Sequence, residues 1–292
     1  MIAPHVPVLC REVLAVFENR PTRIFFDGTV GAGGHAETIL SAHPEIERYL
    51  ACDRDPMALA VAKEKLAPWG KKVEWIHGPF SELAGYLHRL KLRSIDGFLI
   101  DIGISSMQLN AVERGFSFRG DGPLDMRMDP GGDVTAETLV NDLPEEELAR
   151  IFYEYGEERR SRAAARAIVH LRKKRRIRTS GDLLFAIEPV LRRGKIHPAT
   201  KIFQALRIAV NQELQQLQAG LDAAIASLSS GGRLAVISFH SLEDRIVKWR
   251  LKQEASVQIL TKKPVIPSRA EIKANPRSRS AKLRAAEKIG GL

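Results

Sequence analysis

Four short apolar runs, rich in β-branched and aromatic residues, alternate with segments of helical periodicity between residues 22 and 110. We expect these runs to form strands, at residues 23–27, 49–53, 73–77 and 96–102. Strands that alternate with helices pair in parallel, because each helix carries the chain back to the end of the sheet where the previous strand began. The sequence therefore predicts an α/β protein with a mostly parallel sheet.

A helix is expected directly after the second predicted strand. Asp55 can cap its first turn, and Pro56 suits the first helical position, where no backbone N–H is needed. The apolar periodicity carries this helix to about Leu66.

The pattern changes after this first region. Residues 113–200 are rich in helix-forming and charged residues, show no strand-like run, and carry helix-start sequences at Thr135, Pro144 and Thr179. The segment is therefore predicted to be helical throughout.

A β-α pattern returns near the C-terminal end of the chain. A long helix is expected at about 202–228, a turn at 229–232, a strand at 233–239 and a further helix from about Leu242. One α/β domain interrupted by a helical one explains this order. We place the α/β domain at residues 1–112 and 206–292, and the inserted helical domain at residues 113–205.

The positive charge is concentrated in two stretches. The formal net charge is +10, yet residues 159–178 hold ten basic and no acidic residues, and residues 251–292 hold ten basic against three acidic. The rest of the chain is net negative, so the basic stretches indicate a polyanionic partner, most economically nucleic acid. From about Lys262 the basic tail also contains several prolines, and we expect it to be weakly structured without an anion. The cations expected to hold phosphates are Arg172, Lys173, Lys174, Arg175 and Arg176.

A glycine-rich turn follows the first predicted strand. It reads Asp27-Gly-Thr-Val-Gly-Ala-Gly-Gly-His35 and precedes a helix, so its backbone can approach a ligand closely and present helix N–H groups to polar atoms. The spacing Gly31-x-Gly33-x-x-Ala36 also fits a dinucleotide fingerprint, which is a weak signal alone.

Two acidic residues narrow the choice of ligand. Asp53 ends the second predicted strand, where a carboxylate can accept hydrogen bonds from the ribose hydroxyls of an adenosine. Both NAD and S-adenosylmethionine (SAM) contain that ribose. Asp27 stands directly before the glycines and would repel a pyrophosphate, so it favours a ligand with an ammonium group, such as SAM.

Nine sequence motifs stand out along the chain, at residues 26–35, 52–56, 77–80, 101–106, 113–118, 121–129, 155–159, 197–200 and 238–247. Together they resemble the MraW/RsmH family of 16S rRNA cytidine N4-methyltransferases. The resemblance spans nearly the whole chain and implies a class I methyltransferase fold, Rossmann-like, with an inserted helical substrate-recognition domain. It implies SAM as the methyl donor and N4 of a single cytidine in the decoding centre of 16S rRNA as the acceptor.

The same resemblance implies a set of cofactor contacts. Several of these positions already lie on the predicted turn or at predicted strand ends, where open α/β sheets bind their ligands. The implied contacts are Gly33, Gly34, His35, Asp53, Phe80, Asp101 and Gln108.

Two residues are candidates for the chemistry. The N4 amine of cytosine is a poor nucleophile, because its lone pair is delocalised into the ring. A site must therefore accept a hydrogen bond from one of the N4 hydrogens and hold the nitrogen in line with the methyl group. Asp101, at the end of the fourth predicted strand, is expected to be that acceptor or to orient the cofactor. His240 follows a later strand and is expected to be a second polar group, or else a cap for the next helix. An aromatic ring for the target base could come from Phe239, Phe116 or Phe118.

Other classes of protein remain as alternatives. An NAD-dependent enzyme is disfavoured by Asp27, while an RNA-binding assembly factor without catalysis, or a methyltransferase for another RNA or DNA base, stays open. The isolated Cys10 and Cys52 suggest buried thiols, and no metal site is expected because no zinc-like cluster is seen. We expect no membrane association, a cytoplasmic location, and a monomer or homodimer that acts on 16S rRNA within the 30S subunit.

Overall fold

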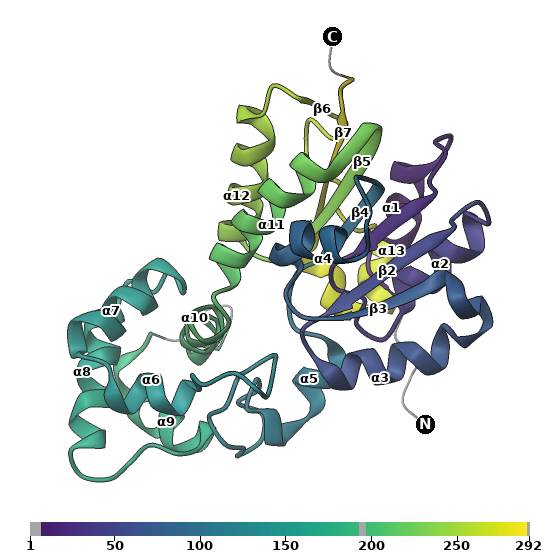
Figure 1. Ribbon diagram of the computed structural model, residues 1–292. Coiled ribbons are helices and arrows are strands. Elements are labelled where there is room, and N and C mark those ends of the chain that lie inside the picture. Colours follow the sequence, from purple (N-terminus) through teal and green to yellow (C-terminus); the bar gives the residue numbers. More distant parts are fainter. Residues whose placement is uncertain (1–6, 193–196, 291–292) are drawn as a thin grey trace. The chain divides into compact units, whose positions relative to one another are not determined.

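The computed structural model describes residues 7–192 and 197–290, which form two compact units (Figure 1). The first unit comprises Met1–Gly103 and Leu214–Leu292, and the second comprises Ile104–Glu213. The second unit extends beyond the 113–205 segment read from the sequence at both ends. In the described part of the chain, no helix combines the length and apolarity needed to cross a membrane.

A seven-stranded sheet forms the centre of the first unit, in the order β3-β2-β1-β4-β5-β7-β6. The five strands from β3 to β5 run parallel, whereas β7 is antiparallel to both of its neighbours. The four predicted N-terminal strands are confirmed within one residue at each end. The strands are β1 (Ile24–Asp27), β2 (Arg48–Asp53), β3 (Val73–His77), β4 (Ile95–Asp101), β5 (Leu228–Ser238), β6 (Val257–Ile259) and β7 (Lys282–Lys288).

Helices cover both faces of this sheet, because neighbouring strand residues point to opposite sides. Phe25 of β1 belongs to the core that also contains α1 to α3, whereas Phe26 belongs to the core with α4, α11 and α12. The helices of the first unit are α1 (Cys10–Phe17), α2 (Gly34–Ala42), α3 (Pro56–Lys65), α4 (Leu83–Arg89), α11 (Glu213–Ser227), α12 (Ser241–Gln253) and α13 (Arg269–Ala274). Short 3-10 helices lie at η1 (Ala67–Lys72), η2 (Phe80–Glu82) and η5 (Pro276–Ser280).

The start of α3 is as predicted. Asp55 is the N-cap residue, its side chain accepts a hydrogen bond from the Met57 amide, and Pro56 occupies the first turn. The helix places β2 and β3 side by side in parallel.

The long helix predicted at 202–228 is wrong. It is two helices, α10 (Ala199–Asn211) and α11, separated by Gln212 in the left-handed conformation (φ 50°). The Asn211 side chain ends α10 by bonding outside the helix, to the Met126 carbonyl and the Met128 amide. A non-glycine residue at positive φ is held by such tertiary contacts rather than by local preference.

The turn predicted at 229–232 is also wrong, because these residues lie inside β5. The register between β4 and β5 shifts there: Ile95 pairs with Leu228, but Gly97 pairs with Arg233. The extra residues form an irregularity in which Gly231 takes a φ of 78°. The glycines thus serve a bulge in a continuing strand rather than a turn.

The basic tail is folded, contrary to the expectation of weak structure. Strand β7 lies between β5 and β6, and its Leu283, Ala285 and Ala286 are buried in the two cores of the sheet. Arg284 and Lys282 both pair with Asp244 of α12, at 2.7 and 3.3 Å. Backbone pairing and buried apolar side chains therefore order this segment, and several of its charges are used within the protein.

The second unit is helical, as predicted, with one isolated β-bridge between Pro123 and Thr179 among its described residues. Capping boxes at Thr135 and Thr179 start two of its helices, which confirms two of the predicted start sites. Its helices are α5 (Ser106–Asn110), α6 (Ala136–Asp142), α7 (Glu145–Glu154), α8 (Ser161–Arg172), α9 (Ser180–Ile187) and α10, with η3 (Val112–Arg114) and η4 (Glu188–Val190).

Candidate cofactor site and its surroundings

The glycine-rich turn connects β1 to α2 at the carboxyl ends of the parallel strands. Gly31 and Gly33 have φ values of 54° and 79°, which favour glycine, and Gly33 is the N-cap residue of α2. Gly28 is needed for space, because a Cβ there would lie 2.7 Å from side-chain atoms of both Ile100 and Phe80. The turn is therefore held close to the sheet, with the N-terminal amides of α2 at its end.

Asp27 is buried beneath this turn with 1% of its surface exposed. Its two carboxylate oxygens accept hydrogen bonds from the Tyr49 hydroxyl, at 2.8 Å, and from the Thr29 amide, at 3.1 Å. Burial raises its pKa to about 6, although these hydrogen bonds act in the opposite direction. Asp27 thus helps to fix the turn through its hydrogen bond from the Thr29 amide.

Asp53, at the end of β2, is bound to the same turn. Its Oδ2 accepts from the Gly31 amide and its Oδ1 from the Asp55 amide, both at 2.9 Å. Burial raises the pKa of Asp53 to about 6. These two hydrogen bonds from backbone amides fix the orientation of the carboxylate. Its remaining lone pairs can accept hydrogen bonds from a ligand hydroxyl.

The structure brings His35 and Asp101 together. His35 lies in the first turn of α2 with 8% of its surface exposed, and its Nε2 is 3.5 Å from Oδ2 of Asp101 at the end of β4. Both ring nitrogens and Asp101 Oδ1 are buried without a well-formed hydrogen bond among the described residues. Polar atoms in this state are characteristic of a ligand site, because burial without a partner costs free energy.

The charge of His35 depends on its neighbours. Burial opposes the imidazolium, but interactions with Asp101 and with the Cys10 thiol outweigh burial and raise the pKa of His35 to about 9. The same contact lowers the pKa of Cys10. Cys10 is half-buried, and its Sγ lies 3.3 Å from Thr38 Oγ1, so the expectation of two buried thiols holds fully only for Cys52.

This arrangement predicts a pH dependence of stability. The pKa of His35 is about 9 in the folded protein against 6.5 as its ordinary value. The stabilisation is therefore complete below about pH 6.5 and is lost as the pH rises through about 9. We expect the thermal midpoint to fall over this window and to fall less in His35→Gln, as measured by calorimetry in matched buffers. Equal slopes for both proteins would contradict the assignment.

The two remaining predicted cofactor contacts are placed differently. Phe80 begins η2 and packs against the β1 turn and against Gly220 of α11, so its ring is partly used in the core. Gln108 belongs to the second unit, where it closes a capping box with Ser105 and is buried. Gly33, Gly34, His35, Asp53, Phe80 and Asp101 all belong to the first unit.

His240 is the N-cap residue of α12. Its Nδ1 accepts from the Glu243 amide at 3.4 Å, and its Nε2 lies 2.9 Å from Glu243 Oε1. The Glu243 carboxylate in turn accepts from the Phe239 amide at 2.8 Å. Of the two roles weighed for His240, the capping role is the one that these contacts describe.

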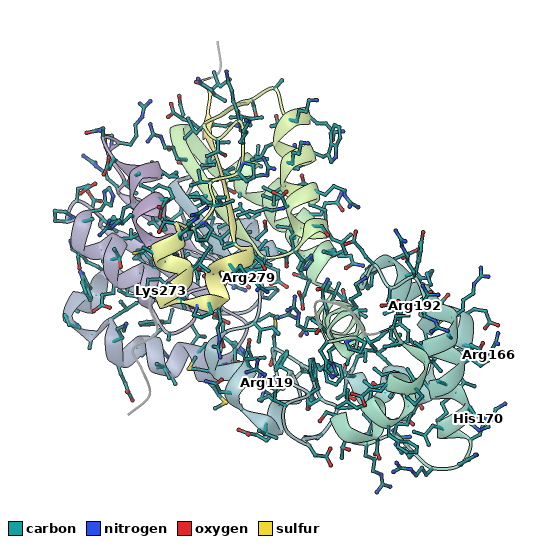
Figure 2. All side chains as sticks on the ribbon, turned by 180° about the vertical axis from the view of Figure 1, so that it is seen from behind. Arg119, Arg166, His170, Arg192, Lys273 and Arg279 are labelled. Atoms are coloured by element: carbon teal, nitrogen blue, oxygen red, sulfur yellow. The ribbon has the colours of Figure 1, made fainter. Side chains whose placement is uncertain are left out.

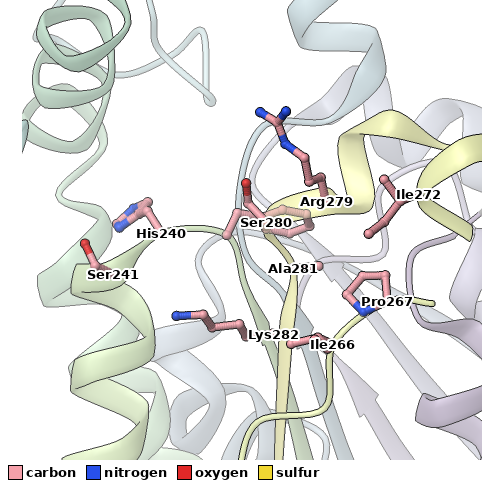
Figure 3. A pocket seen from close by; sticks show the side chains of 10 residues that line it. His240, Ser241, Ile266, Pro267, Ile272, Arg279, Ser280, Ala281 and Lys282 are labelled. Carbon is pink, nitrogen blue, oxygen red and sulfur yellow. The ribbon is translucent and has the colours of Figure 1, made fainter. Parts of the chain in front are cut away.

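A pocket of about 280 Å³ opens beside His240 at the carboxyl end of β5. Figure 3 shows His240 and Ser241 on one side of it and Pro267 and Ile272 on the other. Arg279 and Lys282 add positive charge to its lining. The pocket therefore combines an apolar wall with groups that suit an anion.

The three candidate stacking rings are not equivalent. Phe116 is buried in the core of the second unit, so it is not available to a base. Phe118 stacks on His197, with 4.7 Å between ring centroids, and packs against Phe203. Phe239 lines the pocket beside His240, and its ring lies against Gly103, two residues beyond Asp101. Phe239 is the candidate whose surroundings fit a bound base.

The five predicted phosphate-binding cations also differ. Arg172 donates to the Val140 and Leu143 carbonyls at the end of α6, and Arg175 and Arg176 pair with the acidic residues Asp182 and Glu137. Lys173 and Lys174 are exposed and have no ion pair among the described residues. Three of the five cations are therefore engaged in contacts within the protein.

The fold and this cradle define a class of protein. The sheet is parallel except for β7, a glycine turn follows β1, and acidic residues end β2 and β4. This is the arrangement of a SAM-dependent methyltransferase of class I, as the resemblance implied. The chain matches the MraW methylase family over residues 2–289 and belongs to that family.

Curated relatives agree with this assignment. A protein named ribosomal RNA small subunit methyltransferase H from Chlamydia trachomatis is 52% identical, with 98% of this chain and 97% of that protein covered. Proteins of the same name from Sorangium cellulosum and Heliobacterium modesticaldum are 50% and 46% identical, covering 98% and 99% of this chain and 91% and 100% of theirs. A solved putative methyltransferase from Streptococcus mutans, in complex with SAH, is 14% identical with a TM-score of 0.46, covering 96% of this chain and 97% of that one.

Several residues of the site were missed in the sequence. Tyr49 holds Asp27, Cys10 contacts His35, and Thr29 Oγ1 accepts from the Asp101 amide at 2.6 Å. These contacts join positions 22 or more residues apart, and no local sequence pattern indicates them. Thr29 alone had a signal, because it lies inside the glycine-rich turn.

Proposed function

We propose that this protein transfers the methyl group of SAM to the exocyclic N4 of a single cytidine in the decoding centre of small-subunit rRNA. The observation that carries the proposal is the pairing of His35 with Asp101 beside the glycine turn, where both ring nitrogens and Oδ1 of Asp101 are buried without a well-formed hydrogen bond to any described residue. Membership of the MraW family and the name of its curated relatives, ribosomal RNA small subunit methyltransferase H, support rRNA as the acceptor class.

The residues present fit SAM. The Gly34 amide, at the start of α2, and the cation of His35 beside it suit the carboxylate of the methionine part, and Gly33 is the N-cap residue of that helix. Oδ1 of Asp101 suits its ammonium group, and Asp53 suits the ribose hydroxyls. Phe80 supplies an apolar edge for the adenine. Gln108, the remaining contact implied by the resemblance, belongs to the second unit. When bound, SAM supplies an electrophilic methyl group on a sulfonium.

The chain's own task is then to prepare the acceptor amine. A carboxylate that accepts an N4 hydrogen favours rehybridisation of the nitrogen and fixes its direction. Asp101 is the acid at the ligand end of β4, and its neighbour His35 already engages Oδ2. We assign Oδ1 of Asp101 to this acceptor role or to orientation of the cofactor. His240 would be a second polar group for the acceptor base, in the pocket that it lines. Its hydrogen bond as the N-cap residue of α12 fixes the orientation of its ring.

A direct experiment separates this function from the alternatives. Purified protein would receive SAM with a labelled methyl group and, in parallel, 30S subunits lacking decoding-centre methylation, free 16S rRNA and DNA. Label in 30S subunits or rRNA supports the proposal, and label confined to DNA would indicate another base methyltransferase. Binding of SAM without label in any acceptor would favour an assembly factor without catalysis.

The helical unit is proposed to hold the rRNA through residues 159–178. Lys173 and Lys174 are the members of the predicted run best suited to phosphates, because Arg172 serves the α6 carbonyls. Neutralising both lysines should weaken the dependence of rRNA binding on salt and leave SAM affinity unchanged. An unchanged salt slope would count against this surface.

Arg172 should behave differently from its neighbour Lys173. Arg172→Ala removes two charge-assisted hydrogen bonds at the end of α6 and should lower the free energy of unfolding by about 2 kcal/mol. Lys173→Gln, an exposed change one residue away, should alter it by less than about 0.5 kcal/mol. Chemical denaturation of both variants tests this difference. Equal stabilities would show that the two carbonyl contacts contribute nothing.

A further inference from the structure

A second hollow, entirely within the helical unit, has the chemistry of a site for an unpaired nucleotide. It is open to solvent and offers about 680 Å³ beside α8, α9 and η4. Small side chains at Ala163 and Ala167, one turn apart on α8, leave room for it, and Leu171, Ala186 and Val190 complete its apolar floor. This volume lies within the range of sites for small organic ligands.

Phe185 lines this hollow and is unusually exposed to solvent for a phenylalanine. Its side chain is 67% exposed, the highest value among the large hydrophobic residues that the structure describes. The guanidinium of Arg175 lies 5.9 Å from its ring centroid. An exposed ring face beside a cation costs free energy in water and fits a planar partner such as a nucleobase.

The rim of the hollow is basic. Arg166, His170, Lys174 and Arg175 line it, and no acidic residue does so among those described. Figure 2 shows Arg166 and His170 on the same face of α8. The nearest acidic partners are outside the lining: Glu145 lies 3.6 Å from Arg166, and Asp182 pairs with Arg175.

We propose that this hollow binds an unpaired nucleotide of the RNA substrate, with its base stacked on Phe185 and its phosphates held by Lys174, Arg166 and Arg175. The proposal rests on the proposed RNA function, and it adds a contact that the basic run alone does not imply. Stacking makes the site selective for single strands, because a paired base cannot present its face to the ring. Charge complementarity favours RNA over a protein partner as the occupant.

The test is RNA binding by the full chain, measured without methyl transfer. The probe is a short unpaired pyrimidine oligoribonucleotide that carries one 2-aminopurine, whose fluorescence falls when it stacks. Phe185→Leu keeps an apolar side chain without a ring face and should weaken binding about 5- to 30-fold and abolish the fluorescence change. Phe185→Trp should bind within about twofold of the parent protein, because it retains a ring.

Tyr153→Leu is the matched control, since Tyr153 is 64% exposed on α7 of the same unit and does not line the hollow. It should leave binding unchanged, and a blunt duplex should bind all variants alike. Equal effects of Phe185→Leu and Tyr153→Leu, or none from either, would overturn the proposal. Because no methyl is transferred in this assay, the outcome is independent of whether the chain methylates cytidine.

Discussion

Replacement of Asp101 by alanine is expected to lower the rate of methyl transfer by about 100-fold or more, with the fold intact. Asp101 ends β4 in parallel register with Ile237, and its backbone amide donates to Thr29. Those backbone contacts do not depend on the carboxylate, so the strand should survive its removal. The lost group is a carboxylate that faces His35 and whose Oδ1 is buried without a hydrogen bond to any residue that the structure describes.

Two readouts separate the possible roles of Asp101. If the carboxylate accepts a hydrogen bond from N4, the single-turnover rate of Asp101→Ala should fall while its dissociation constant for SAM stays near that of the parent protein. If the carboxylate orients the cofactor, SAM affinity falls as well. Asp101→Asn keeps an oxygen without the charge and should retain more activity in the first case than in the second. A folded alanine variant with near-normal turnover would contradict both roles.

Replacement of Glu213 by alanine is expected to lower the free energy of unfolding by about 3 to 5 kcal/mol. Glu213 and Arg207 form a two-pronged ion pair at 2.8 Å, with side chains only 4% and 12% exposed. Removal of the carboxylate takes both of these hydrogen bonds from a guanidinium that is only 12% exposed. The midpoint of unfolding in urea measures the loss, and Arg207→Met with Glu213→Leu should recover most of it.

An exposed ion pair in the same unit provides the comparison. Glu154 pairs with Arg150 across one turn of α7, and the two side chains are 46% and 52% exposed. Glu154→Ala should change the free energy of unfolding by no more than about 1 kcal/mol. If Glu154→Ala and Glu213→Ala destabilise equally, burial of the Glu213 pair does not carry the effect.

Features that depend on a continuous local pattern could be predicted. The strands β1, β2 and β4 are short runs that are mostly buried on both faces, so their apolar character shows in the sequence directly. The start of α3 and the capping boxes of the helical unit follow from side chains within a few residues of the bonded amides. The glycine turn was visible for the same reason.

Features that depend on distant contacts could not be predicted. Strand β7 has no clear signal in the sequence, because its buried residues Leu283, Ala285 and Ala286 stand among charged residues. One of these, Arg284, forms an ion pair with Asp244 of α12. The break between α10 and α11 falls at Gln212, which has no intrinsic preference for positive φ. The contacts of Arg172 with the α6 carbonyls could not be foreseen, because a run of cations looks the same in the sequence whether it faces solvent or binds a helix end.

The candidate site was predictable only in part. The acids at strand ends and the glycines were evident, and the family resemblance supplied His35, Phe80 and Gln108. Neither source revealed that Tyr49 secures Asp27 or that Cys10 contributes to the charge of His35. Such supporting contacts arise when the sheet aligns segments that are separate in the chain.

The central claim is best tested by identifying the methylated nucleoside. Unmethylated 30S subunits would be incubated with the protein and SAM, and their rRNA digested and analysed by mass spectrometry against standards for each methylated cytidine. The account predicts N4-methylcytidine at one position, absent when the Asp101→Ala variant is used. Methyl groups on carbon 5, on the ribose, or on another base would contradict it.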